Sequence, residues 1–264
     1  MLNRVRAMGI MVVTLLGLQV GCPATSVGGV PMLSTGAQWT EATIPVGEPV
    51  GIAAGNGRLF VTDAATKEVV ALRLDTGKVD KRITLALAAP KGLAFDGTLL
   101  WVADEKTRRI QALSPTTGKI VREIPLDAPP EKGYHSVGGL TWDGSHLWTA
   151  IAAGFSSSFN QIDSSNGHIE RSLFADCDPR GLVSDGSTLW SLCFNGAQLP
   201  ASLDRRDLTG DEVAFQRSRK VVGKVEGPMP SAVLLDGQQL WLLRGSDKRL
   251  TVFPIDQTGS PVPH

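Results

Sequence analysis

The stretch Gly92-Leu93-Ala94-Phe95-Asp96-Gly97-Thr98-Leu99-Leu100-Trp101 decides the fold, because similar ten-residue phrases begin at Gly51, Gly139, Gly181 and Ala232. Each copy ends in Leu followed by an aromatic residue, and these aromatic residues are Phe60, Trp101, Trp148, Trp190 and Trp241. Their separations of 41 to 51 residues match the length of a four-stranded propeller blade. Such a repeat indicates units that must stack to bury their apolar faces.

The residues within one copy predict a four-stranded antiparallel meander. Apolar runs at 92–95 and 99–103 flank an Asp-Gly pair. Asp-Gly between apolar runs is a strong hairpin signal, because glycine accepts a positive φ. Two further runs, 110–113 and 120–124, are separated by a Thr-Gly break at 117–118 and supply the third and fourth strands.

The two ends of the chain are expected to share one blade. The fifth copy stops after its third strand, at 250–253, whereas the segment 36–46 resembles 118–126 because both end in Ile-Pro-aliphatic. An N-terminal strand that completes the last blade would close the ring and protect its sheet edges. We therefore predict an all-β fold, a β-propeller of five four-stranded blades, as a single domain over residues 38–264.

Charge and composition exclude some partners. The chain contains 26 Lys plus Arg and 26 Asp plus Glu, so it has no positive excess to drive binding to a phosphate backbone. Nucleic acid is therefore not an expected partner, and the basic run 217–220 is expected to be a solvated strand or loop face. We expect a monomer without a cofactor.

Residues 1–21 are expected to be a signal peptide of the lipoprotein type. Arg4 and Arg6 precede the apolar stretch 7–20, which is too short to span a bilayer as a helix. Gly21-Cys22 would be the cleavage pair and Cys22 the lipidated residue, followed by a tether over 22–37 that is rich in small residues and proline. The prediction is an exported bacterial protein in the periplasm or on the outer cell surface, touching the membrane through its lipid anchor alone. The alternative is a cysteine that lies near an ordinary cleavage site by chance.

The two remaining cysteines, Cys177 and Cys193, flank the Asp185-Gly186 hairpin at nearly equal distances. They should face each other across an antiparallel pair, within reach of a disulfide. An exported protein would oxidise such a pair. Two unpaired core cysteines are the alternative, and no metal site is expected because no His or third Cys lies nearby in the sequence.

Two aspartates, Asp63 and Asp104, lie three residues after the repeat aromatic in the first and second copies. A short carboxylate at such a place can hold a turn through hydrogen bonds from the backbone. We therefore predict a structural role for both.

Loops at one end of the central channel are expected to carry the function. Lys91 and Arg180 directly precede the repeat glycine in two copies and are predicted to face the channel mouth, where they would favour an anionic ligand. The candidate ligand-binding residues are Lys91, Tyr134, His135, Phe155, Ser156, Arg180 and Asn195. Solvated surface with local ion pairs is the alternative interpretation.

The segment 147–163, which runs from Leu-Trp through serines 156–158 to Ile-Asp, resembles the five-bladed glutaminyl cyclotransferases. The whole repeat is similar to the bacterial propeller group that also includes gluconolactonase-like and streptogramin-lyase-like proteins. The resemblance implies a five-bladed ring. The cyclotransferase family carries a functional glutamate directly after the Leu-aromatic pair, where this chain has Val61, Val102, Thr149, Ser191 and Leu242.

Two hypotheses of different class follow. The first is a membrane-tethered binding propeller that recognises a small anionic ligand, a peptide or a protein at this end of the ring. The second is a propeller enzyme of cyclotransferase, lactonase or lyase type. It would use His135 as acid or base, with Lys91 and Arg180 holding an anionic transition state.

Overall fold

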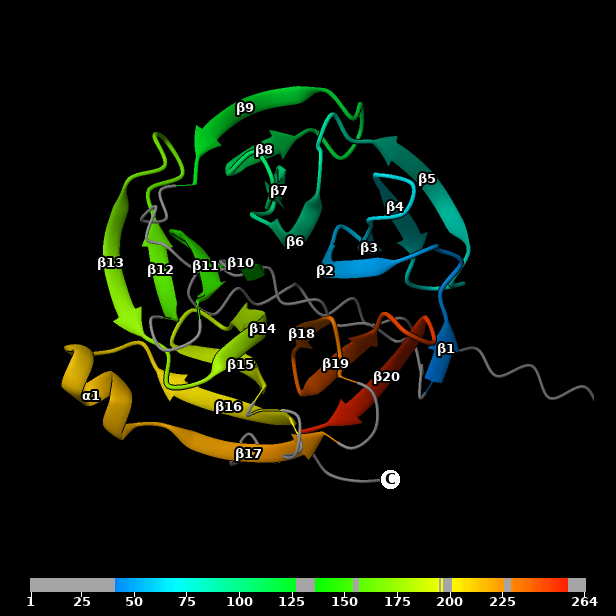
Figure 1. Ribbon diagram of the computed structural model, residues 1–264. Helices are drawn as coiled ribbons and strands as arrows, with labels where there is room; N and C mark the ends of the chain where they lie inside the picture. The colour runs from blue at the N-terminus through cyan, green and yellow to red at the C-terminus, as the bar shows by residue number, and fades with distance from the viewer. Residues whose placement is uncertain are drawn as a thin grey trace, which may run out of the picture.

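The structure, a computed structural model, describes residues 41–126, 136–153, 157–194, 196, 201–225 and 229–255. These residues form five four-stranded antiparallel sheets, arranged as blades around a central axis (Figure 1). The prediction of an all-β, five-bladed propeller is therefore confirmed. The expected signal peptide, the tether and Cys22 lie outside the described residues, so those boundaries stay predictions.

Four blades follow the chain order from an inner strand beside the axis to an outer strand at the rim. Blades 1 and 2 contain β2 (Pro49–Gly55), β3 (Arg58–Asp63), β4 (Glu68–Arg73), β5 (Val79–Thr84), β6 (Pro90–Phe95), β7 (Leu100–Asp104), β8 (Arg109–Leu113) and β9 (Ile120–Pro125). Blades 3 and 4 contain β10 (Ser136–Trp142), β11 (Leu147–Ala152), β12 (Ser158–Ile162), β13 (Ile169–Phe174), β14 (Asp178–Ser184), β15 (Thr188–Phe194), β16 (Ala201–Asp207) and β17 (Lys220–Val225). Blade 5 contains β18 (Ala232–Asp236), β19 (Gln239–Arg244), β20 (Arg249–Pro254) and β1 (Glu41–Thr43).

The ring is closed by strand β1, as the sequence predicts. β1 pairs antiparallel with β20, and the register places Glu41 opposite Thr251 and Thr43 opposite Arg249. Directly after β1, Ile44 and Val46 are buried in the core between blades 5 and 1. The closing segment therefore contributes hydrogen bonds to one blade and apolar contacts to the next.

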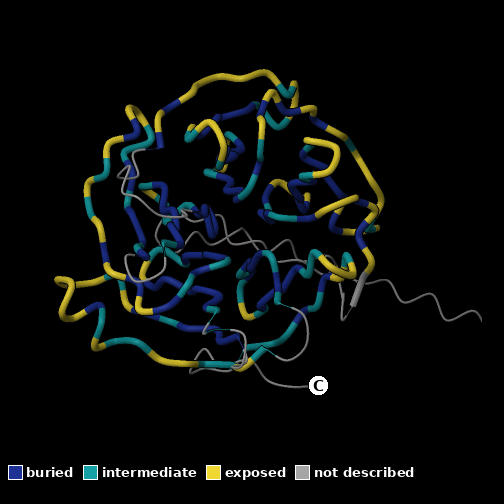
Figure 2. Tube along the Cα trace, in the orientation of Figure 1, coloured by how far each residue is buried: buried dark blue, intermediate teal, exposed yellow. Residues whose placement is uncertain are grey.

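The Asp-Gly hairpins and the repeat aromatics act together. Asp96 Oδ1 accepts hydrogen bonds from the backbone N–H of Thr98 and Leu99, and Asp96 Oδ2 accepts one from Trp101 Nε1 at 2.7 Å. Asp143 binds Trp148 in the same way. One carboxylate thus holds the turn and satisfies the indole of a buried tryptophan between the blades. Figure 2 shows the result, with buried residues inside and exposed residues along the rim.

Asp63 and Asp104 hold the loops that enter blades 1 and 2, as predicted. Asp63 accepts backbone hydrogen bonds from Gly47 at 2.7 Å and Glu48 at 2.8 Å, and Asp104 accepts them from Ala88 and Ala89. Burial on its own would raise the pKa of both carboxyls. The backbone hydrogen bonds outweigh that effect and leave both pKa values below the ordinary aspartate range.

The predicted disulfide between Cys177 and Cys193 is confirmed, with 5.5 Å between the two Cα atoms. The expected register is wrong, because the hairpin does not turn at Asp185-Gly186 alone: Ser184 pairs with Leu189, so the turn spans residues 185–188. A bulge between Pro179 and Gly181 then places Cys193 opposite Pro179. Cys177 therefore lies in the entering loop and not across the hairpin. Cys193 lies three residues after its repeat aromatic, at the position of Asp63 and Asp104. A covalent bond in blade 4 thus does what a carboxylate does in blades 1 and 2.

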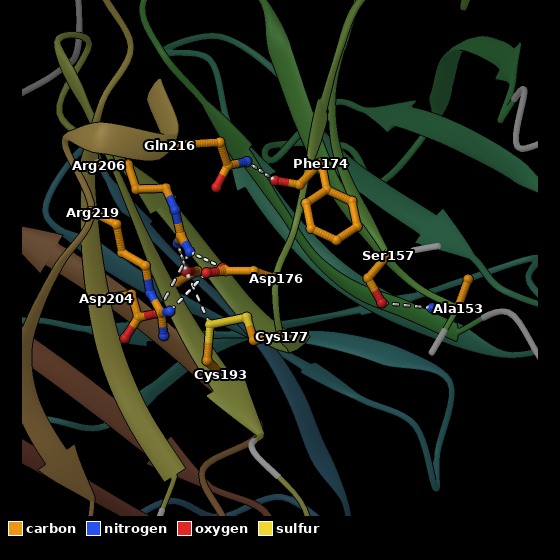
Figure 3. The surroundings of a disulfide bond; sticks show 11 residues. Ala153, Ser157, Phe174, Asp176, Cys177, Cys193, Asp204, Arg206, Gln216 and Arg219 are labelled. Atoms are coloured by element: carbon orange, nitrogen blue, oxygen red, sulfur yellow. Dashed lines mark hydrogen bonds and ion pairs between the residues drawn. A yellow bond between two sulfur atoms is a disulfide. The ribbon is translucent and has the colours of Figure 1, made fainter. Parts of the chain in front are cut away.

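A charged network lies beside the disulfide, between blades 3 and 4 (Figure 3). Arg206 has a fully buried side chain that pairs with Asp176, donates to Ser191 Oγ and lies 3.7 Å from Asp204 Oδ2. Arg219 donates to Asp204 at 2.8 Å and to Asp176 at 2.7 Å. The prediction that the run 217–220 is merely a solvated face is therefore wrong for Arg219.

A short helix, α1 (Glu212–Arg217), covers this network, although the sequence pattern predicted strands alone. Asp211 caps its N-terminus by accepting from Ala214 N, and Phe215 is fully buried against Phe159. Both rings also lie over the Arg206 guanidinium, at 5.5 and 5.6 Å from their centroids. No helix in the described part of the chain is long and apolar enough to cross a membrane.

Candidate functional site

The five blades converge on one pocket at the channel mouth, with a volume of about 360 Å³. The residue directly before the ten-residue phrase lines this pocket in every blade, and these residues are Val50, Lys91, Gly138, Arg180 and Ser231. Each inner strand begins at this end of the ring, so the same repeat position reaches the axis five times. The remaining described lining residues are Ser136, Val137, Phe194, Met229 and Pro230.

One wall of the pocket is bare backbone at Gly138. A Cβ atom placed there would lie 1.9 Å from the carbonyl oxygen of Pro179, so no side chain fits. The close approach joins the first strands of blades 3 and 4.

Lys91 contributes a positive charge from blade 2. Its Nζ lies 3.7 Å from Glu105 Oε2, and its side chain keeps about a third of its surface exposed. Glu105 also accepts a hydrogen bond from Val137 N at 3.1 Å, so this carboxylate ties blade 2 to the neighbouring blade 3. The ammonium group is thus near its carboxylate partner without a close contact, and it keeps access to solvent.

Arg180 contributes the second positive charge from blade 4. Its Nη2 donates to Asp178 Oδ2 at 2.6 Å, and its Cζ lies 5.8 Å from the ring centroid of Phe194. An arginine has five N–H donors, and the described residues accept one hydrogen bond from this guanidinium. The group is therefore oriented by Asp178 and Phe194 while donors remain for a ligand.

Below the mouth, the channel becomes narrow and apolar. A cavity of about 50 Å³ lies there, lined mostly by apolar residues of the inner strands such as Ile52, Leu93, Leu140 and Val233. A ligand of ordinary size would therefore be held at the mouth and would not pass through the ring.

The structure brings together two of the predicted ligand-binding residues, Lys91 and Arg180, in one pocket. Ser136 also lines this pocket. In the sequence it directly follows the predicted pair Tyr134-His135. The other candidates lie outside the described residues, namely Tyr134, His135, Phe155, Ser156 and Asn195. Their roles, including that of His135 as acid or base, stay predictions.

Sequence reasoning missed Val50, Gly138 and the segment 229–231 as pocket residues. A signal was present, because the offset that led to Lys91 and Arg180 exists in all five copies. At that offset Val50, Gly138 and Ser231 carry no charge, so they gave no indication of an anion site.

One other group has the composition of a metal site. The sulfurs of Cys177 and Cys193 and a carboxylate oxygen of Asp204 lie within 4.8 Å of one another. Both sulfurs are joined in the disulfide, so neither is a thiolate ligand. The group therefore belongs to the structural network of blade 4.

No family model and no curated protein matches the chain. Solved structures do resemble it. Glutaminyl cyclase from Myxococcus xanthus matches with a TM-score of 0.57 and 14% identity, over 82% of this chain and 95% of that chain. A chain of the nidogen/laminin complex matches with a TM-score of 0.55 and 17% identity, over 79% and 76%.

A third match is catalytically inactive virginiamycin B lyase from Staphylococcus aureus with quinupristin, at a TM-score of 0.50 and 19% identity. It covers 78% of this chain, which spans 66% of the lyase chain. The chain also spans 61% of a Kuenenia stuttgartiensis hydrazine synthase chain, at 18% identity and a TM-score of 0.49. Identities this low show the propeller fold alone.

Proposed function

We propose that this chain is an exported, membrane-tethered binding propeller that recognises an anionic group of a small molecule, a peptide or a protein at the channel mouth. The observation that carries the proposal is the convergence of all five blades on one pocket that contains Lys91 and Arg180. Pockets of this size are typical of ligand sites, and a pair of cations within one favours a negatively charged partner.

The chemistry of the walls narrows the ligand further. Val50, Val137, Phe194 and Met229 offer apolar contact next to the two cations. A carboxylate beside an apolar group fits this combination, as in a free peptide C-terminus with an apolar last residue. Arginine can hold such a carboxylate through two N–H donors, and the lysine adds charge.

The structural neighbours are compatible with binding at a propeller. They include enzymes, such as the glutaminyl cyclase, and a protein complex, that of nidogen with laminin. At this distance in sequence, neither activity transfers to this chain. Our preference for binding rests on the pocket, where the described lining side chains supply charge and apolar contact.

Calorimetry with N-acetyl-phenylalanine and its uncharged carboxamide tests the proposal. We expect the carboxylate to bind about tenfold or more tightly than the amide, and the preference to weaken with salt. A Lys91→Gln/Arg180→Gln double variant should lose the preference. The matched control is Lys78→Gln/Lys119→Gln, which removes two exposed lysines from the hairpins between third and fourth strands.

Equal binding of acid and amide, or an unchanged preference in the Lys91/Arg180 variant, would contradict the proposed site. If the wild type converted the carboxylate probe into a product and His135→Ala did not, the result would favour the enzyme hypothesis.

The tether is tested separately by fractionating a bacterial host that expresses the full chain. Supporting observations are the apolar stretch ahead of Cys22 and the disulfide of blade 4, which fits an oxidising compartment. Cys22→Ser should move the protein from the membrane fraction to the soluble fraction. Cys177→Ser is the control, because it leaves the tether intact. Lipid anchoring would be contradicted if the wild type, Cys22→Ser and Cys177→Ser were all found in the same fraction.

A further inference from the structure

A second cavity, of about 470 Å³, lies between blades 4 and 5. Its lining comes from the outer strands β16 and β17 of blade 4, from strands β19 and β20 of blade 5, and from Pro230 ahead of β18. The lining residues are Leu203, Gly223, Lys224, Val225, Pro230, Leu240, Leu242, Arg244, Thr251 and Phe253. Pro230 also borders the channel-mouth pocket, so the two cavities share one wall.

One aliphatic side chain of the repeat is missing beside this cavity. The outer strands of blades 1, 2 and 3 place Ile83, Ile124 and Leu173 opposite the third strand, and all three are buried. Blade 4 places Gly223 at that position, opposite Leu203. Among the described residues, the glycines with a positive φ do not include Gly223, so its φ does not call for a glycine.

The cavity is mostly apolar, and two cations line it, the exposed Lys224 of β17 and Arg244 of β19. Leu240 and Leu242 of β19 point toward blade 4, where they join the core formed with Leu203. Arg244 continues the same face of β19, because alternate residues of a strand share a side. Arg244 therefore lies at the end of an apolar row.

The guanidinium of Arg244 is weakly engaged. Its Nε lies 3.9 Å from Asp247 Oδ2, and its Nη2 lies 3.4 Å from Thr251 Oγ1. In blades 1 and 2 the equivalent position holds Asp63 and Asp104, which fix the entering loops. The charge at this repeat position is thus reversed in blade 5, beside a cavity of ligand size.

We propose that this cavity binds an amphiphilic monoanion, with its aliphatic chain against Leu203, Leu240 and Leu242 and its carboxylate on Arg244. The chain takes the volume that the missing side chain leaves. The carboxylate receives charge-assisted hydrogen bonds from a guanidinium whose present contacts are long. This site is independent of the proposed function at the channel mouth.

The test uses decanoate below its micellar concentration, with decan-1-ol and acetate as matched probes. Trp190, which packs in the same core as Leu240 and Leu242, reports binding by its fluorescence. We expect decanoate to bind about tenfold or more tightly than decan-1-ol, and acetate to bind much more weakly than either. Arg244→Gln should weaken decanoate to the level of decan-1-ol and leave decan-1-ol unchanged.

Gly223→Leu is the second variant, because it restores the aliphatic side chain of the repeat and occupies the part of the cavity next to Leu203. It should abolish binding of decanoate and of decan-1-ol and raise the melting temperature. Arg73→Gln, at an exposed ion pair of blade 1, is the control and should bind like the wild type.

Two outcomes would overturn the proposal. One is decanoate that binds Gly223→Leu as tightly as the wild type. The other is an Arg244→Gln variant that keeps its preference for decanoate over decan-1-ol. The Arg244 variant leaves the core unchanged, so the test stands even if Gly223→Leu fails to fold. Loss of decanoate binding in Lys91→Gln/Arg180→Gln, with Arg244→Gln unaffected, would place the anion at the channel mouth instead.

Discussion

The two faces of blade 4 differ in how they are filled. Toward blade 3, the blade carries a buried arginine, two aspartates, a disulfide and the covering helix α1. Toward blade 5, it leaves a cavity of about 470 Å³ next to Gly223. Both faces come from the same repeat, in which blades 1 to 3 use simple aliphatic side chains at Ile83, Ile124 and Leu173. The comparison teaches that a repeat fixes where side chains point, whereas single substitutions decide whether an interface is closed or open.

The largest expected effect concerns Arg206 on the closed face. Arg206→Met should lower the free energy of unfolding by about 3 to 5 kcal/mol, because the buried Asp204 and the partly buried Asp176 lose a partner. Urea denaturation measures the change. The control is the neighbouring Arg205→Met on the opposite face of β16, where the guanidinium lies over Trp190 at 5.8 Å. That change should cost about 1 kcal/mol or less. Equal losses in the two variants would break the comparison.

The disulfide is expected to rank next. Cys177→Ser/Cys193→Ser should lower the free energy of unfolding by about 3 kcal/mol, since the crosslink closes a loop of 16 residues in the unfolded chain. Thermal and urea unfolding of the oxidised protein and the double variant measure this. A double variant as stable as the oxidised protein would show that the charged network holds the closed face without the covalent bond.

The carboxylates that hold the loops of blades 1 and 2 should contribute less than the disulfide. Asp104→Asn should cost about 1 to 2 kcal/mol at neutral pH, because the ionised carboxylate accepts two backbone hydrogen bonds from the loop. The folded pKa of Asp104 is lowered, so this stabilisation is complete above the unfolded pKa of about 4 and is lost as the pH falls through the folded pKa.

Stability measured against pH checks this prediction. The difference between wild type and Asp104→Asn should shrink below about pH 4. A difference that stays constant down to pH 2 would mean that the role of Asp104 does not depend on its charge.

The smallest effect is expected at the cap of α1. Asp211→Ala should lower the free energy of unfolding by about 1 kcal/mol, because Ala214 N loses its acceptor at the helix N-terminus. Hydrogen exchange at α1 and β13 should increase, while exchange at blade 5 stays the same. Faster exchange on the open face as well would show that the two faces of blade 4 are coupled.

The sequence predicted the ring, its closure and the disulfide, because these depend on local signals that recur at fixed spacing. Asp-Gly pairs mark hairpins wherever they occur, and equivalent positions such as those of Lys91 and Arg180 must meet at the axis. Predictions failed where the local geometry departs from these simple patterns. The hairpin of blade 4 turns over residues 185–188 and not at Asp185-Gly186 alone, which places Cys193 opposite Pro179. A helix of six residues is too short to show a period.

The two unusual sites of blade 4 could not be read from one sequence. Arg206 belongs to a residue type that is almost always exposed, so its burial depends on partners that are distant in the chain. Gly223 resembles an ordinary strand glycine until its register is compared with that of Ile83 and Leu173. Both features depend on the strand pairing, which sets the residues that are equivalent between blades.

Strand β1 determines how the ring would respond to a mechanical load. Any pull on the residues ahead of Glu41 acts first on three register pairs between β1 and β20. After these pairs, Ile44 and Val46 are buried between blades 5 and 1. Their apolar contacts would resist the pull once the pairs between β1 and β20 had separated. The weakest point under tension therefore coincides with the seam that closes the ring. A tethered propeller of this design would open at blade 5 while the channel-mouth residues Lys91 and Arg180, in blades 2 and 4, kept their places.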